Sequence, residues 1–410
     1  MPVSIVVVIG GGHAAGQVVT SLRQEGFLGR IVLIGDEPVP PYQRPPLSKT
    51  FLAGEMPPER LLLKSRDFYL QSDVELRLGV RVRCVRLADR TVELEDGSTL
   101  AFDHLVFATG SRPRTLGAEG AGHPRVYCLR TLADAQALRP LMRPGIRLML
   151  IGGGYIGLEI AAVANALGLQ VCVLEATPQL LSRVAGAAVG AFYRDLHCQY
   201  GVEVRCNTSV RRIEDKGGYP VAVLNDGDRI EADAVVVGIG ALPNLELARD
   251  AGLVCNHGIV VDEHCRTSVP GVYAAGDCTE QPSMLFDAQI RLESVPNAIE
   301  QGRTVAATIC GKDRPNRAVP WFWSDQYDVK LQSAGLQRGH DQAVMRGSPA
   351  RRSFAIYYLR SGRLLAIDAI NRPAEFALAK AWIAQRRVVE PAWLADDAVP
   401  IKQIVSEHGP

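Results

Sequence analysis

A strand, a glycine-rich turn and a helix occur in the same order at two places in the chain, and this duplication constrains the fold more than any other feature. The apolar run 4–9 enters a triple glycine at Gly10, and the apolar run 147–151 enters a second triple glycine at Gly152. A helical pattern and another short apolar run follow each turn. Because a repeat of this kind decides the architecture before any local detail, we predict two related α/β units.

The second copy has the spacing of a dinucleotide-binding fingerprint. Gly152, Gly154 and Gly157 follow a strand and open a helix, and Glu175 ends the next strand about 20 residues further on. The first glycine allows a tight turn, the second lets backbone amides approach a pyrophosphate, and the third lets the helix pack closely on the strand. We therefore expect this turn to hold a dinucleotide whose ribose hydroxyls donate hydrogen bonds to Glu175.

The first copy is a variant of the same fingerprint. Gly10 and Gly12 hold the first two positions, Ala15 is the permitted alanine at the third, and Asp36 ends the next strand. One such motif is weak evidence, since glycine-rich turns also occur for packing alone, but two motifs with an acid each favour binding. The sequence thus predicts two dinucleotide sites, one for a resident cofactor and one for an exchanging cofactor.

Both predicted units end with the same sequence pattern, and a different pattern of predicted elements follows them. Hairpin-like stretches at 93–98 and 223–228 precede the buried runs 105–110 and 234–240, each of which ends at a glycine. After residue 320, short strand patterns and one helical pattern indicate a third unit of the α+β type. The predicted fold class is therefore α/β, with two Rossmann-like dinucleotide-binding domains and a C-terminal α+β domain.

The composition sets limits on function. With 410 residues, 47% of them hydrophobic and 22% charged, the chain is expected to fold into two to three domains. A formal charge of +1 argues against non-specific nucleic-acid binding, and the absence of any run near 18 apolar residues argues against a membrane protein. The first apolar run lacks a basic segment and is interpreted as a strand, not a signal peptide. The nine cysteines show neither Cys-x-x-Cys nor metal-ligand spacing, so we expect no metal site.

A later strand-to-turn motif distinguishes the two dinucleotide sites. Residues 267–278 contain a short apolar run that ends at Gly276 and Asp277. Here the chain resembles the two-dinucleotide flavoproteins, which have a glutathione-reductase-like fold and in which such an aspartate binds the ribityl chain of FAD. The alternative is a turn aspartate that caps a helix. The resemblance implies an FAD-binding domain of residues 1–111 and 244–319, an NAD-binding domain of residues 112–243, and a C-terminal interface domain of residues 320–410.

The segment after the first fingerprint indicates the electron acceptor. Disulfide reductases of this family carry a cysteine pair there, but residues 41–49 contain no cysteine. Together with residues 291–298 and 320–326, this segment resembles the putidaredoxin reductase-type family of FAD-dependent NADH:ferredoxin reductases. The resemblance implies a cytoplasmic enzyme that uses NADH to reduce a [2Fe-2S] ferredoxin, which then serves a cytochrome P450 or a ring-hydroxylating oxygenase.

The same resemblance assigns three catalytic residues. Hydride transfer to a flavin leaves negative charge near N1 and N5, so a cation beside the ring should help, and Lys49 is the candidate. A buried lysine needs a partner, and Glu159 corresponds to that partner in this family. Trp323 is placed beside the flavin on the side where ferredoxin docks. The alternatives are a surface lysine, a glutamate favoured at a helix start, and a core tryptophan.

Further cofactor-binding positions also follow from the resemblance. Arg44 and Arg130 are expected to face the FAD pyrophosphate or ring, and the alternative is that each is a solvated surface arginine. His13 is interpreted as a turn residue because hydride transfer needs no general acid or base. The remaining positions assigned to the cofactor sites are Ala14, Val82, Ala108, Thr109, Gly110, Val295 and Gly240.

A cluster of basic residues has two interpretations. Arg77, Arg81, Arg83 and Arg86 are close together in sequence, and the alternating run 80–84 indicates a strand with two of them on one face. Such a cluster is either a solvated face or a landing surface for an acidic ferredoxin.

Two other functions remain open from the sequence. The first is an NADH oxidase or quinone reductase, which high turnover with oxygen or a quinone would favour. The second is a redox-dependent interaction flavoprotein that resembles apoptosis-inducing factor. The C-terminal region has no long basic insertion to suggest the second role.

Overall fold

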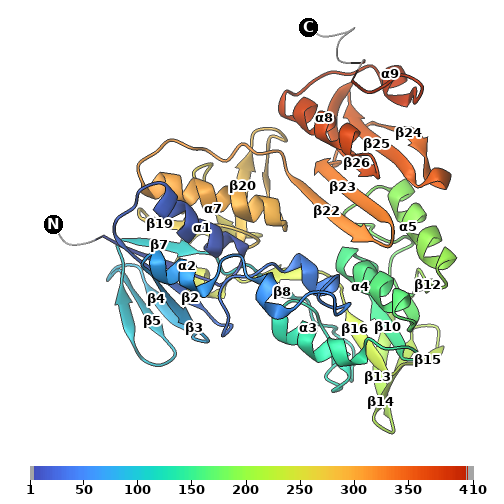
Figure 1. Cartoon of the computed structure of the whole chain (residues 1–410), viewed down its shortest axis with the longest axis horizontal. Helices are drawn as coiled ribbons and strands as arrows, with labels where there is room; N and C mark the ends of the chain where they lie inside the picture. The colour runs from blue at the N-terminus through green and yellow to red at the C-terminus, as the bar shows by residue number, and fades with distance from the viewer. Residues whose placement is uncertain (1–3, 403, 405–410) are drawn as a thin grey trace. The chain divides into compact units, whose positions relative to one another are not determined.

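The chain folds into two compact units (Figure 1). The computed structural model describes residues 4–402 and residue 404. The first unit takes in Met1–Gln43, Glu59–Arg112 and Leu242–Phe322, and the second takes in Arg44–Pro58, Pro113–Ala241 and Trp323–Pro410. Each unit holds one copy of the repeated strand, turn and helix.

A five-stranded parallel sheet forms the centre of the first unit, in the order β19-β7-β1-β2-β3. Its strands are β1 (Ile5–Ile9), β2 (Arg30–Gly35), β3 (Val74–Leu78), β7 (His104–Phe107) and β19 (Val272–Ala274). The strands after β1 extend the sheet first on one side of β1 and then on the other. Such a switch in strand order creates a crevice at the carboxyl ends of the strands, where ligands bind in open α/β sheets.

Both faces of this sheet are covered, which explains the unbroken apolar run of β1. Val6 and Val8 pack in one core with α1 (His13–Gln24) and α7 (Val295–Ile309), two helices that lie side by side (Figure 1). Val7 and Ile9 pack in a second core with a three-stranded antiparallel sheet. That sheet consists of β4 (Val82–Arg86), β5 (Thr91–Leu94) and β6 (Thr99–Ala101). A strand buried on both faces has no polar face to alternate with.

The second unit repeats this arrangement. Its parallel sheet has the order β12-β11-β10-β16-β9, and helix α4 (Tyr155–Ala166) follows the central strand as α1 does in the first unit. Met149 and Ile151 of the central strand pack against a three-stranded antiparallel sheet. The strands of these two sheets are β9 (Val126–Tyr127), β10 (Arg147–Ile151), β11 (Gln170–Leu174), β12 (Glu203–Arg205), β16 (Ala234–Val237), β13 (Val210–Lys216), β14 (Tyr219–Leu224) and β15 (Arg229–Glu231).

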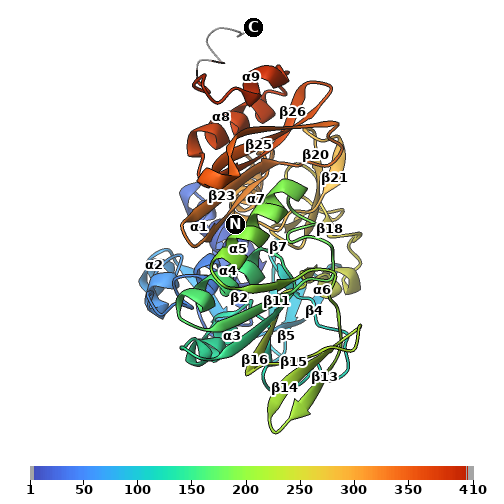
Figure 2. The same ribbon diagram turned by 90° about the vertical axis from the view of Figure 1, so that its right-hand side faces the viewer.

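The second unit also contains a C-terminal sheet in the order β22-β23-β26-β25-β24, in which β23 to β26 pair antiparallel. Helix α8 (Pro373–Ala384) packs on β23 and β26 (Figure 2). The predicted fold class, two Rossmann-like units and a C-terminal α+β unit, is confirmed. The strands of this sheet are β22 (Trp321–Gln326), β23 (Val329–Gly335), β24 (Gln342–Ser348), β25 (Ser353–Arg360) and β26 (Arg363–Ile370).

The other elements are the 13-residue helix α5 and a set of short helices and strands. In the described part of the chain, no helix is long and apolar enough to cross a membrane. The remaining elements are η1 (Pro45–Ser48), η2 (Pro58–Leu61), α2 (Arg66–Gln71), β8 (Ser111–Pro113), α3 (Leu132–Leu138), η3 (Arg139–Leu141), α5 (Ala187–Gln199), β17 (Ala241–Pro243), α6 (Glu246–Asp250), β18 (Ile259–Val260), β20 (Thr279–Ser283), β21 (Ala288–Ile290), η4 (Pro349–Arg351) and α9 (Pro391–Ala395).

One local prediction was wrong. The alternating run 80–84 does not form one strand, since β4 begins only at Val82 and carries a bulge between Val82 and Cys84. Val80 instead donates its N–H to the carbonyl of Gly35, which holds it in the turn before β4. Arg81 therefore lies outside the strand that carries Arg83.

A buried arginine anchors the C-terminal segment to the last sheet. Arg346 on β24 is 2% exposed and lies 3.8 Å from Glu375 and 3.6 Å from Asp397. Its guanidinium also donates to the backbone carbonyls of Asp396 and Val399. Because a buried charge is costly without partners, this cluster ties the segment after α9 to the sheet.

Replacing Arg346 with methionine should lower the free energy of unfolding by about 3 kcal/mol, because Glu375 loses a buried cation and two carbonyls lose their donor. Arg351→Met is the matched control, since Arg351 is 68% exposed and pairs with the same Asp397 at 3.4 Å. The control substitution should lower the free energy of unfolding by less than about 1 kcal/mol. Urea unfolding followed by circular dichroism measures both variants, and equal losses would contradict the anchoring role.

Candidate functional site

The first glycine-rich turn lies at the carboxyl end of β1, beside the switch point of the sheet. Gly10 has φ +130°, and a Cβ at this residue would lie 2.1 Å from the carbonyl oxygen of Ala108, so only glycine fits. At Gly12, the cap residue that directly precedes α1, a Cβ would meet no atom within 4 Å. Among the described residues, none caps α1 through its side chain. Open space in front of an uncapped helix start forms a cradle that fits a pyrophosphate.

The turn that carries Asp277 reaches the same end of the sheet. A Cβ on Gly276 would lie 3.1 Å from the Cβ of Ala14 in the first turn of α1. The N–H of Gly276 donates to Oε1 of Gln301, a fully buried side chain of α7, at 2.7 Å. Asp277 accepts a hydrogen bond from Ser111 at 2.8 Å. The fold thus fixes Asp277 beside the glycine cradle, as a role in FAD binding requires.

The other predicted residues of the first unit lie at the ends of its strands and helices. Thr109 and Asn244 exchange two hydrogen bonds, of 2.9 and 2.8 Å, just after β7. Val82 begins β4 and Val295 begins α7. Asp36 directly follows β2, whose last residue, Gly35, contacts Gly11 of the turn, and its side chain is 58% exposed with Arg81 3.6 Å away.

The second glycine-rich turn has the same construction. Gly152 has φ +108°, and a Cβ there would lie 2.5 Å from the carbonyl oxygen of Gly238. A Cβ on Gly157 would lie 2.5 Å from the carbonyl oxygen of Gly152, so the helix packs on the turn too closely for a side chain. Gly154 is the cap residue that directly precedes α4, and none of the described side chains caps that helix start. This second cradle also fits a dinucleotide pyrophosphate.

Glu175 is connected to this second turn by hydrogen bonds. Its Oε2 accepts from the backbone N–H of Gly153 at 2.7 Å, and its Oε1 accepts from the N–H of Thr177 at 2.8 Å. The hydroxyl of Thr177 also donates to Oε1, at 2.7 Å, and because a carboxylate offers about four acceptor sites, capacity remains for about one ribose hydroxyl. Gly240, with φ +109°, lies at the end of the neighbouring strand, and Arg183 donates to the preceding carbonyl, that of Ile239, at 3.0 Å.

Lys49 and Glu159 form an ion pair within the second unit. The Lys49 Nζ lies 2.7 Å from the Glu159 Oε2, and the side chains are 17% and 6% exposed. Glu159 also accepts hydrogen bonds from the hydroxyls of Ser48, at 2.5 Å, and Ser324, at 2.6 Å. The sequence predicted the pair but missed both serines. The only available signal was their presence in the segments 41–49 and 320–326.

The structure also places the predicted residues Arg44, Arg130 and Trp323 of the second unit. Arg44 donates to the backbone carbonyl of Arg130 at 2.6 Å, so the structure brings these two predicted arginines together. The N–H of Arg130 donates to Asp134 at 3.0 Å, beside the capping box that begins α3. Trp323 is half-buried on β22 and directly precedes Ser324.

The four arginines of the cluster pair with three neighbouring carboxylates, and Glu75 also pairs with Arg30. Each of its members lies within 4 Å of a carboxylate: Arg77 and Glu75, Arg81 and Asp36, Arg83 and Glu93, and Arg86 and Glu93. Exposed pairs of this kind contribute little attraction for a distant partner. The structure therefore favours a solvated face over a landing surface.

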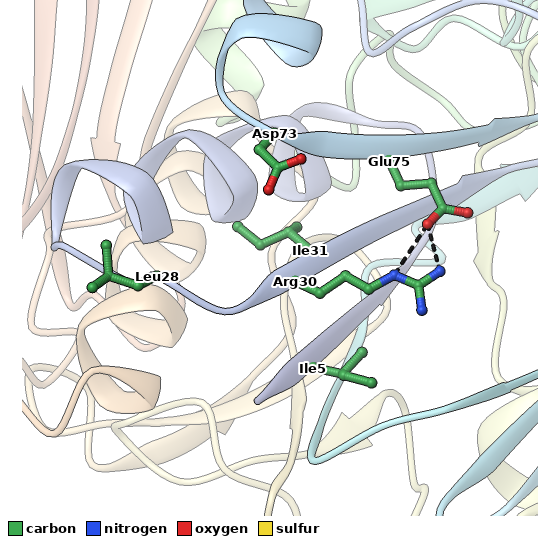
Figure 3. Close-up of a pocket in the computed structure, with 6 residues that line it drawn as sticks. All are labelled: Ile5, Leu28, Arg30, Ile31, Asp73 and Glu75. Atoms are coloured by element: carbon green, nitrogen blue, oxygen red, sulfur yellow. Dashed lines mark hydrogen bonds and ion pairs between the residues drawn. The ribbon is translucent and has the colours of Figure 1, made fainter. Parts of the chain in front are cut away.

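A surface hollow of about 400 Å³ lies away from the glycine turns (Figure 3). Its lining includes Ile5, Arg30 and Ile31, which begin β1 and β2, and an ion pair of 2.6 Å between Arg30 and Glu75. These residues lie at the amino ends of the parallel strands, whereas Gly10 lies at the carboxyl end. The hollow is therefore not the dinucleotide site.

Comparison with known proteins identifies the family. Residues 4–302 match the model of the pyridine nucleotide-disulphide oxidoreductase family, and residues 321–405 match that of the reductase C-terminal domain. Putidaredoxin reductase of Pseudomonas putida is 44% identical over 98% of this chain and 96% of its own length. The ferredoxin–NAD(+) reductase component of the anthranilate 1,2-dioxygenase system of Burkholderia cepacia is 40% identical over 97% of this chain and 98% of its own length. A chain in the crystal structure of the covalent putidaredoxin reductase–putidaredoxin complex matches with a TM-score of 0.96 at 43% identity, over 98% of both chains.

These matches agree with the two glycine cradles. They confirm that the chain is an oxidoreductase, and that FAD and a nicotinamide nucleotide are its cofactors. They also confirm the resemblance that the sequence motifs indicated. The chain belongs to the pyridine nucleotide-disulphide oxidoreductase family, within the putidaredoxin reductase-type group that carries the reductase C-terminal domain.

Proposed function

We propose that the protein is a cytoplasmic, FAD-dependent NADH:ferredoxin reductase. Its acceptor is a [2Fe-2S] ferredoxin, which supplies a cytochrome P450 or a ring-hydroxylating oxygenase. One observation carries this proposal: the segment 41–49 contains Lys49, paired with a buried carboxylate, and contains no cysteine. Without a cysteine pair next to the flavin, electrons cannot leave through thiol–disulfide exchange, so they must pass to a separate acceptor.

The domain roles follow from the two cradles. Residues 1–111 and 244–319 are assigned to FAD, which Gly10, Gly12 and Asp277 would hold. Residues 112–243 are assigned to NADH, which the second glycine turn and Glu175 would hold, and residues 320–410 to the ferredoxin interface. FAD, when bound, supplies the conversion of one hydride into two single electrons.

Lys49 supplies a fixed positive charge in this proposal. The carboxylate of Glu159 and the backbone carbonyl of Pro45, which accepts from the same ammonium at 3.5 Å, restrict where the ammonium group can lie. A cation that is held in place before the reaction stabilises developing negative charge without reorganising. Because Glu159 is 5% exposed, water screens the pair less than it screens an exposed pair.

The proposal is tested by NADH-driven reduction of a [2Fe-2S] ferredoxin from the same organism, with ferricyanide as the alternative acceptor. A complex that must form and separate at every turnover relies on charge for its association rate. We therefore expect ferredoxin reduction to fall several-fold, on the order of 3–10 times, between low and moderate ionic strength, while ferricyanide reduction changes little. High turnover with oxygen or a quinone, and none with ferredoxin, would contradict this proposal and indicate an NADH oxidase or quinone reductase instead.

The purified protein should prefer NADH over NADPH. The carboxylate of Glu175 accepts from ribose hydroxyls and repels a 2′-phosphate. In Glu175→Ala the preference, measured as the ratio of kcat/KM values, should narrow by about tenfold. Glu203→Ala is the control, since Glu203 lies on the neighbouring strand and pairs with Arg205 instead. A wild-type protein that uses NADPH equally well would overturn the assignment.

Trp323→Ala should impair ferredoxin reduction by about tenfold or more and leave ferricyanide reduction nearly unchanged, because an aromatic anchor at an interface typically contributes this much. Trp393→Ala on α9 is the control, since Trp393 is 37% exposed and lies on a different element. Steady-state rates with both acceptors separate the two effects. An equal loss with both acceptors would show that Trp323 serves the flavin or the fold and not the docking of ferredoxin.

A further inference from the structure

A row of buried polar side chains runs inward from α5 to Glu159 within the second unit. Glu159 on α4, Ser324 and Gln326 on β22, and His197 on α5 are all at most 5% exposed. Ser324 and Gln326 occupy alternate positions of one strand, so their side chains lie on the same face. Buried polar groups are costly unless each finds a partner, so four of them together call for an explanation.

These side chains form a continuous series of hydrogen bonds. Oγ of Ser324 lies 2.6 Å from Glu159, and Nε2 of Gln326 lies 3.1 Å from that same Oγ. Oε1 of Gln326 lies 2.9 Å from Nε2 of His197, whose Nδ1 lies 3.2 Å from the hydroxyl of Tyr327. The series therefore joins α4, β22 and α5 through side chains alone.

The direction of the series follows from counting protons at each atom. Glu159 lies 2.7 Å from the ammonium of Lys49 and faces the hydroxyls of Ser48 and Ser324, so its oxygens act as the acceptors. Ser324 has a single hydroxyl proton and must donate it to Glu159, so its oxygen is left to accept from Gln326. The Gln326 atom that faces Ser324 is consequently the amide nitrogen, and the amide oxygen faces His197.

The same reasoning continues to the imidazole. Because the Gln326 oxygen only accepts, His197 must carry a proton on Nε2. Desolvation by burial lowers the pKa of His197, although its bond to Gln326 opposes this, which favours at pH 7 the neutral ring without a proton on Nδ1. Nδ1 then accepts from Tyr327, whose own pKa burial raises, which keeps that hydroxyl protonated. Every donor in the series thus points toward Glu159.

We propose that Ser324, Gln326 and His197 are positioning residues for the Lys49–Glu159 pair, acting as a one-way series of donors that ends on the Glu159 carboxylate. Ser48 donates to the other oxygen of this carboxylate at 2.5 Å, so both oxygens are fixed. Fixing both oxygens fixes the place where the ammonium of Lys49 can pair. The consequence for flavin reduction rests on the proposed function, whereas the direction of the hydrogen bonds does not.

The first experiment measures which nitrogen of His197 carries the proton. Two-dimensional ¹H–¹⁵N correlation of the ring nitrogens in histidine-labelled protein should show the neutral Nε2–H form at pH 7. A neutral ring protonated on Nδ1 would reverse the series and overturn the proposal. This measurement needs no substitution and no turnover, so it is independent of folding variants and of the role of Lys49.

The second experiment compares two serine variants. Ser324→Ala removes the acceptor of Gln326, so its amide is free to turn over, and we expect His197 to shift toward the Nδ1–H form. Ser333→Ala is the matched control, because Ser333 is also buried and donates to a different carboxylate, Asp368, at 2.5 Å on the same sheet. The control should leave the His197 signals unchanged, and equal spectra for both variants would contradict the series.

The third experiment connects the series to the reaction. In anaerobic stopped-flow mixing with NADH, Ser324→Ala should slow flavin reduction by about tenfold with little change in the NADH concentration at half-saturation, as expected for a lost bond to a charged group. Ser333→Ala should react at the wild-type rate. If Lys49→Met reduces as fast as wild type, the proposed role of Lys49 fails while the His197 result still decides the series. If Lys49→Met is slow and Ser324→Ala is not, the positioning role fails.

Discussion

The buried carboxylate of Glu159 is the constraint on which the arrangement of the second unit depends. An ionised carboxylate removed from water costs several kcal/mol unless it is paired and hydrogen-bonded. Here Lys49, Ser48 and Ser324 supply three charged or polar donors at 2.7, 2.5 and 2.6 Å. These donors come from the segment around η1 and from β22, while Glu159 lies on α4. The hydrogen bonds and the ion pair to this one carboxylate therefore hold together three parts of the chain that are distant in sequence: the segment around η1, α4 and β22.

The two glycine turns have the same backbone geometry but differ in how the acidic residue beside each turn is held. Gly10 and Gly152 both adopt positive φ against the carbonyl of a neighbouring strand, and both turns lead into a helix with an open start. Beside the second turn, Glu175 is fixed by the N–H of Gly153. Beside the first, Asp36 is exposed and lies near Arg81. At the second turn, the nucleotide that exchanges at every turnover thus meets a carboxylate, that of Glu175, whose orientation is already fixed.

Much of the fold could be predicted from sequence, because the duplicated turns and the unbroken apolar strands are local patterns. The pair of Lys49 and Glu159 was also predictable, although only through family resemblance. The role of Ser324 was not predictable, since Ser324 lies 165 residues from Glu159 in sequence and no local sequence pattern indicates a hydrogen bond over that separation. The interpretation of the arginine cluster likewise depended on strand register, which decides that Arg83 meets Glu93.

The most direct test of this account is the ionisation state of Glu159 itself. Infrared difference spectra between wild type and Glu159→Gln, recorded with ¹³C-labelled glutamate at pH 7, isolate the stretching bands of this one carboxyl group. The account predicts the pair of bands of an ionised carboxylate, and it predicts that Ser324→Ala shifts them while Ser333→Ala does not. A protonated carboxyl band in the wild-type protein would contradict the ion pair and the series of donors that ends on it.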